Sequence, residues 1–202
     1  MTLKTIRDTV IATIGPDTEL QVANYNVFIN EGYTNIIAKI LDERKDFFPD
    51  TETISVVASD VDITPTKTWS NITLIQVDFG EGGGYVTLTK DSLENVKASS
   101  QGNIYCLWGN DIYVPDFEKA FTMRIYGYVV PADLSQDGDT PVFSTLLHPL
   151  LITWAVGRAV ESNSSSENFL DGGRKRAEFW ETLENILPSV IMKDMTNVKS
   201  LI

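Results

Sequence analysis

Residues 121–161 read FTMRIYGYVVPADLSQDGDTPVFSTLLHPLLITWAVGRAVE, and the spacing of their apolar side chains changes partway along. Phe121, Met123 and Ile125 alternate with polar residues, and this period of two predicts a β-strand with one buried face. After an acidic loop, the apolar side chains of residues 146–155 recur at the spacing of a helix face. The stretch therefore predicts a strand followed by a helix.

The N-terminal part of the chain, residues 1–48, has helical spacing throughout. Gly15-Pro16 ends a first helix, and the second is predicted to run to Pro49. Gly32 is the weak point of this second helix, because an interior glycine costs about 1 kcal/mol relative to alanine.

Between these helical parts, residues 51–130 have a period of two. Gly109-Asn110 is a hairpin-turn signal, and the glycine-rich run 80–84 predicts another turn between strands. We expect about six strands in an antiparallel sandwich or barrel. The predicted fold class is α+β: a helical bundle from residues 1–48 and 131–187, with a β-domain inserted at 49–130 and a C-terminal docking segment at 188–202.

The C-terminal segment is the strongest candidate for a binding surface. Leu187, Ile191, Met195, Val198 and Ile202 step by 4, 4, 3 and 4 residues, the spacing of an apolar helical stripe. Such a stripe packs either on its own domain or on another chain, and the adaptable methionines favour a partner chain. The candidate docking residues are Leu187, Ile191, Met192, Met195, Val198, Leu201 and Ile202.

Three adjacent cations, Arg174, Lys175 and Arg176, form a second candidate contact surface for an acidic partner. They follow Gly172-Gly173, so either a helix begins at the glycines or one helix from Ser165 carries both glycines in its interior. A solvated helix face is the alternative interpretation of the cations.

The composition restricts the classes of partner. Sixteen Lys and Arg against 28 Asp and Glu give a net charge of −12, which opposes DNA binding through phosphate neutralisation. No apolar run has the roughly 18 residues that a membrane span needs, and we expect no export signal at the N-terminus. The lone Cys106 excludes an internal disulfide.

Signs of catalysis, cofactor binding or metal binding are weak. The run GEGGGY at residues 80–85 lacks the GK[ST] of a P-loop and leads into a strand. Asp133, Asp137 and Asp139 lack the late glutamate of a calcium loop. His148 is the only histidine, and neither it nor Cys106 has an evident catalytic partner. We therefore expect no catalytic residues, no cofactor and no metal.

The order of these features resembles the head-to-tail adaptor, or connector, proteins of tailed bacteriophages. The likeness lies in the paired tyrosines 126 and 128, the Pro-x-x-Leu turn at 131–134, the acidic loop 137–139, Pro141, and the alanine-bearing helix at 150–159. VFINEGY at residues 27–33 is similar to the family's early helix, and IYCLWGNDIYVPD to the strand pair before the tyrosine-rich strand.

The resemblance implies a structural virion protein that forms a ring, usually of twelve copies, in the neck between head and tail. One side would dock on the portal protein, often through C-terminal segments, and the other would receive the tail or nozzle, while DNA passes through the channel without specific binding. Assembly would occur in the host cytoplasm, without a membrane. The alternative is a β-sandwich ligand- or receptor-binding module with Trp69, Trp108 and Tyr113 as exposed stacking residues.

Overall fold

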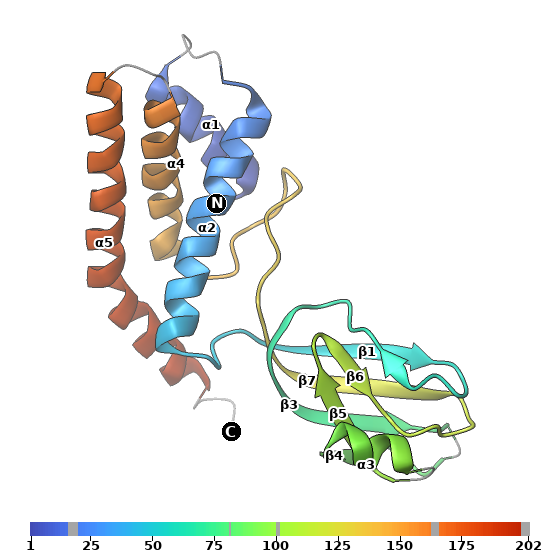
Figure 1. The fold of residues 1–202 in the computed structure, drawn as a ribbon. Helices are drawn as coiled ribbons and strands as arrows, with labels where there is room; N and C mark the ends of the chain where they lie inside the picture. The colour runs from blue at the N-terminus through green and yellow to red at the C-terminus, as the bar shows by residue number, and fades with distance from the viewer. Residues whose placement is uncertain (16–19, 81, 100–101, 163–165, 199–202) are drawn as a thin grey trace. The chain divides into compact units, whose positions relative to one another are not determined.

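The computed structural model describes residues 1–15, 20–80, 82–99, 102–162 and 166–198, without the side chains of 166–169 and 193–198. The chain divides into two compact units (Figure 1). Met1–Arg44 and Ala132 onward form a helical unit, and Lys45–Pro131 form a β unit inserted between them. The predicted α+β class, with helices at both termini and a sheet inserted between them, is confirmed.

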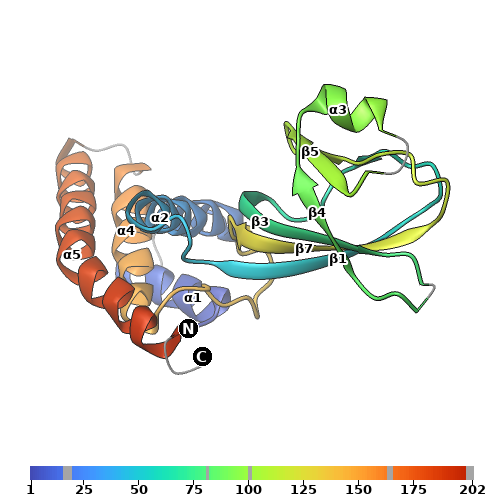
Figure 2. The same ribbon diagram turned by 90° about the horizontal axis from the view of Figure 1, so that it is seen from below.

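Within the described residues, the helical unit contains four α-helices and one 3₁₀ turn. They are α1 (Leu3–Ile14), α2 (Val22–Glu43), η1 (Thr145–Leu147), α4 (His148–Ser162) and α5 (Ser166–Val198). The Thr2 hydroxyl accepts a hydrogen bond from the Thr5 backbone N–H and caps the start of α1. Viewed down the bundle, α4 lies between α2 and α5 (Figure 2).

Helix α2 packs antiparallel to α4. The Arg158 guanidinium of α4 pairs with the Glu31 carboxylate at 2.6 Å and lies over the Phe28 ring. One turn earlier on α4, Trp154 lies against Gly32, where an added Cβ would be only 3.0 Å from the indole ring. Gly32, the predicted weak point of the helix, therefore makes room for Trp154.

Helices α4 and α5 are also antiparallel and approach closely at two glycines. A Cβ at Gly172 would lie 2.6 Å from the Gly157 carbonyl oxygen, a separation that side chains do not tolerate. The Trp154 and Phe179 rings pack with centroids 4.9 Å apart. Of the two alternatives that the sequence left open, a single helix through Gly172 and Gly173 is the one observed.

The β unit is built on one seven-stranded sheet. In their order across the sheet the strands are β1 (Pro49–Val56), β7 (Phe121–Val129), β3 (Trp69–Asp78), β4 (Val86–Lys90), β5 (Ile104–Trp108), β6 (Asp111–Tyr113) and β2 (Asp62–Ile63). Phe121, Met123 and Ile125 are buried, as their alternation predicts. The core is completed by Val56, Ile63, Ile75, Val77, Leu88, Tyr105, Ile112 and Val114.

The β unit differs from the sequence prediction in one connection. A short helix, α3 (Leu93–Ala98), begins after the Ser92 cap and links β4 to β5. Because a helical crossover returns the chain in the same direction, these two strands pair in parallel and the sheet is mixed. Six residues are too few to show a helical period, so the sequence did not predict α3.

The second helix also ends earlier than predicted. It stops at Glu43, where Arg44 adopts an extended conformation, and the chain then enters the β unit. Phe48 is buried, and its carbonyl accepts a hydrogen bond from the Val129 N–H. The residue before Pro49 is biased away from the helical region, which fits the early end.

Candidate functional site

The long helix α5 continues past the helix on which it packs. It has 33 residues against 15 in α4, or about 50 Å against about 22 Å at 1.5 Å per residue. Because Trp154 lies level with Phe179 and the helices are antiparallel, His148 at the start of α4 is level with about residue 185 of α5. The last part of α5 therefore projects beyond α4 (Figure 1).

The predicted docking residues divide along this projecting part. Leu187 is fully buried in the helical unit, as is Val190, so Leu187 belongs to the core. Ile191 is half-buried, and Met192 exposes 70% of its surface. The last side chains described on α5 are thus the buried Val190, the half-buried Ile191 and the exposed Met192.

The remaining docking candidates lie further along. Met195 and Val198 are on α5, but their side chains are not among those described, and Leu201 and Ile202 lie outside the described residues. Pro188 lies inside the helix, where its missing N–H leaves the Glu184 carbonyl without its usual helical donor. A proline inside a helix favours a bend, and Figure 1 shows that the last part of α5 bends away from the direction of its first part.

The three predicted contact cations have different environments. Arg176 faces inward: its guanidinium pairs with Glu161 at 2.8 Å and lies 5.9 Å from the Trp154 ring centroid. Lys175 pairs with Glu178 on its own helix at 2.8 Å. Arg174 is the most exposed of the three, with 82% of its side chain exposed, and it makes only a long, exposed ion pair with Asp171 at 3.8 Å.

Ion pairs that the sequence analysis missed join α2, α4 and α5. Arg158 bonds Glu31 of α2 and Glu161 of its own helix, while Glu161 also holds Arg176 of α5. The hydrogen bonds that Arg158 donates to Glu31, above all, raise the pKa of Arg158. In the sequence, the i,i+3 spacing of Arg158 and Glu161 could have predicted the ion pair between them. This spacing gives no information about partners on other helices.

His148 has a structural environment. It is buried, its Nδ1 lies 3.0 Å from the Met1 amino group, and its Nε2 lies 3.2 Å from the Phe143 carbonyl oxygen. Burial, followed by the nearby ammonium charge, lowers the pKa of His148, and the Phe143 carbonyl opposes that shift. These contacts fix the start of α4 against the N-terminus of α1.

The acidic loop also has a structural explanation. The Asp139 carboxylate accepts hydrogen bonds from the Gln136 and Ser135 N–H groups, both at 2.7 Å, which lower its pKa. Asp137 pairs with Arg7 of α1 at 2.9 Å. Within the described part of the chain, no group of three or more His, Cys, Asp or Glu side chains is placed to hold a metal ion.

The aromatic residues of the alternative interpretation have unlike surroundings. Trp69 packs against the β core and donates its indole N–H to Glu52 at 3.3 Å. Tyr113 is half-buried under the Lys97 ammonium, 5.9 Å from the ring centroid. Trp108, at the β5–β6 turn, is 64% exposed. Only Trp108 among these three therefore displays its ring to solvent.

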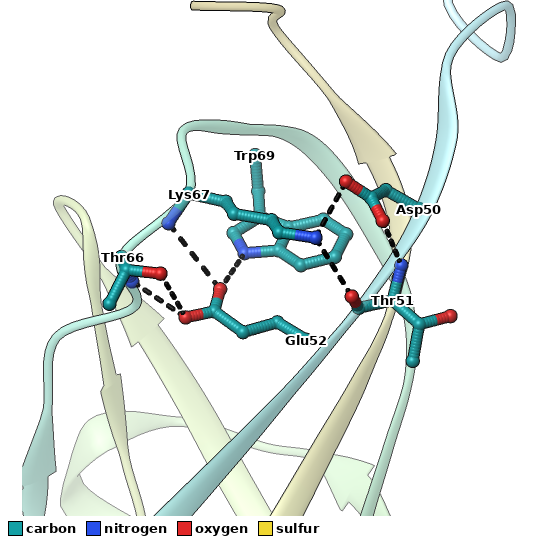
Figure 3. A network of polar contacts seen from close by, with 6 residues as sticks. All are labelled: Asp50, Thr51, Glu52, Thr66, Lys67 and Trp69. Carbon is teal, nitrogen blue, oxygen red and sulfur yellow. Dashed lines mark hydrogen bonds and ion pairs between the residues drawn. The ribbon is translucent and has the colours of Figure 1, made fainter.

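A buried carboxylate in the β unit was not predicted from the sequence. Glu52 of the end strand β1 accepts hydrogen bonds from the Thr66 N–H at 2.8 Å and hydroxyl at 2.7 Å, and from Trp69 (Figure 3). Lys67 contributes its backbone N–H to Glu52 and its ammonium to Asp50. The network ties β1 to the loop that follows β2, the strand at the other end of the sheet.

Comparisons with known proteins agree with this arrangement. A family model described as SU10 adaptor protein matches residues 1–199 of the chain. No curated protein matches it. None of the helices in the described residues combines the length and apolarity needed to cross a membrane. The chain therefore belongs to the SU10 adaptor protein family, an adaptor family of the phage head-to-tail connector.

Proposed function

We propose that this chain forms a ring in the neck of the virion, joining the portal protein to the tail or nozzle. The ring has about twelve copies, assembles in the host cytoplasm and surrounds the channel through which DNA passes. The observation that carries the proposal is the family match over residues 1–199 together with an α5 that projects beyond its own bundle. The protein acts by assembly and catalyses no reaction.

The projecting end of α5 is the part that docks on the portal. Its own unit buries Leu187 and Val190 but leaves Met192 exposed, and on this basis we propose Ile191 as the start of the docking segment. Burying apolar side chains is worth about 25 cal/mol per Å² removed from water, and this supplies the driving force. The segment from residue 191 to 202 packs its apolar stripe on the portal.

A truncation tests the docking role. A chain that ends at Ile191 keeps the buried Leu187 and Val190 and is expected to retain its circular dichroism spectrum and melting temperature. It is expected to lose co-elution with the portal protein of the same phage in size-exclusion chromatography. Undiminished co-elution of the shortened chain overturns the assignment.

A point variant of the full chain separates docking from folding. Met192→Asp puts a charge on the projecting part of α5, where we expect portal affinity to fall at least about tenfold, because a buried unpaired charge is costly. Thr13→Asp introduces the same charge on the exposed end of α1 and is the matched control. Equal affinities of the two variants, measured by biolayer interferometry, contradict the proposal.

A further inference from the structure

The outward face of α2 has fewer charges than a solvated helix usually carries. Ala23, Val27, Thr34 and Ala38 are exposed and lie on the side of α2 away from its buried residues. Val27 exposes 56% of its surface. Between Val27 and Thr34 the face carries one acidic side chain, Glu31, whose charge is paired with Arg158 of α4. In a chain with a net charge of −12, an outer helix face with so few unpaired charges is typical of a helix covered on both sides.

The outward face of α5 carries a second stripe of a different kind. Leu170, Arg174, Ala177 and Glu181 recur at three- and four-residue steps and are exposed. Leu170 exposes 72% of its surface, the largest exposed fraction given for any large apolar residue described. This face therefore presents an apolar side chain beside the exposed cation Arg174.

The two faces belong to the two outer helices of the row α2, α4, α5, because α4 lies between α2 and α5 (Figure 2). Since α4 is antiparallel to both, α2 and α5 run in the same direction. Trp154 touches Gly32 on one side and Phe179 on the other, so these two positions are level.

The residues that precede Gly32 on α2 and Phe179 on α5 by the same number of positions lie at the same height along the bundle. Leu170, nine residues before Phe179, is level with Ala23, nine residues before Gly32. Arg174 is level with Val27 in the same way, one turn from the half-exposed Glu31 carboxylate. Apolar groups therefore lie level with apolar groups, and the cation lies near an acidic side chain.

We propose that these faces are the two halves of one interface between copies of this chain, with the α5 stripe of one copy packed on the α2 stripe of the next. This inference rests on the proposed ring assembly and names its lateral surfaces. A closed ring needs two different, complementary patches on each subunit, and the outward stripes of α2 and α5 are different and complementary. Arg174 of one copy then lies beside the Glu31 carboxylate of its neighbour, as a second cation next to the Arg158 that Glu31 already binds.

Disulfide crosslinking tests the pairing, in the full chain with Cys106→Ser, alone and bound to the portal. Val27→Cys combined with Arg174→Cys places the two thiols level on facing helices. Ala38→Cys combined with Arg174→Cys is the mismatched control, because position 38 is about 16 Å further along α2. The matched pair is expected to give a ladder of crosslinked multimers on mild oxidation, and each single cysteine none.

Each result decides the question. A ladder from the matched pair alone supports the interface. Dimers from the Val27→Cys single variant indicate a symmetric contact of α2 with itself and overturn it, as does an equal ladder from the mismatched pair. Rings seen by electron microscopy without any crosslink overturn these faces but leave ring assembly intact. A chain that stays monomeric even on the portal overturns the ring and this inference together.

A charge reversal gives an independent measurement. Arg174→Glu brings a like charge to Glu31 of the neighbour and is expected to raise the concentration for half-assembly at least about fivefold. Lys175→Glu changes the same charge one residue away, where the side chain pairs within its own helix, and is expected to leave that concentration within about twofold. Equal effects of the two variants overturn the role of Arg174.

Discussion

At the scale of single residues, Glu52 shows how a buried charge is kept. Its burial disfavours the ionised carboxylate, but hydrogen bonds from Thr66, Lys67 and Trp69 outweigh that effect and lower its pKa. Glu52→Gln places an amide N–H₂ opposite groups that are themselves donors. We expect the free energy of unfolding to fall by about 1–3 kcal/mol, measured by urea denaturation. Asp50→Asn, which breaks only an exposed ion pair with Lys67, is expected to cost less than about 1 kcal/mol.

The same carboxylate makes stability depend on pH. Because the folded pKa of Glu52 lies below the unfolded value of about 4.3, its contribution is complete above that pH and is lost as the pH falls through the folded pKa. The gap in unfolding free energy between the wild-type chain and Glu52→Gln is therefore expected to shrink from about pH 6 to about pH 3. A constant gap would show that the charge is irrelevant.

His148 gives a dependence at higher pH. Burial lowers its folded pKa below the unfolded value of about 6.5, so the unfolded chain binds a proton first as the pH drops. Stability is expected to decline from about pH 7 toward the folded pKa, and His148→Gln is expected to flatten that decline. The measurement is the melting temperature of the wild-type chain and of His148→Gln from pH 7.5 to 5.5. If the two proteins lose stability in parallel, the role of His148 is contradicted.

At the scale of secondary structure elements, the α4–α5 contact depends on a glycine pair. Gly172→Ala drives a methyl group into the Gly157 backbone and the Glu161 side chain, so we expect a loss of about 2–4 kcal/mol by denaturant unfolding. Gly173 has open space at its Cβ position, and Gly173→Ala in the same helix is expected to stabilise by about 0.5–1 kcal/mol. Equal effects would mean that the helices are further apart than described.

The elements also show what the sequence predicts and what it leaves open. Periodicity predicted the strand that contains Met123 and the turn at Gly109, because both signals are local. It did not predict the parallel β4–β5 pair, since α3 is too short to show a period. Nor did it assign Leu187 to the core, because a buried stripe and a docking stripe have the same spacing. Which chain covers a stripe depends on tertiary contacts.

At the scale of the whole molecule, the acidic surface governs the relation to DNA. Proteins bind DNA largely because their Lys and Arg side chains neutralise phosphates and release counterions. A chain with a net charge of −12 lacks this driving force. We therefore expect the purified protein to leave duplex DNA unretarded in a mobility-shift assay at about 100 mM salt. Retardation that weakens with added salt would reveal a basic surface and contradict the proposed passive channel.

The insertion of the β unit between α2 and α4 sets the order in which a newly made polypeptide can fold. Helix α2 ends at Glu43, but α4, which covers its apolar face, begins only at His148. At ribosomal rates of about 5–20 residues per second, α1 and α2 wait roughly 5–20 s for that partner, while the β unit can already close behind them. A nascent subunit therefore completes the helix α5 last of all. In the proposed ring, lateral contacts through α5 would then form only when synthesis is almost finished.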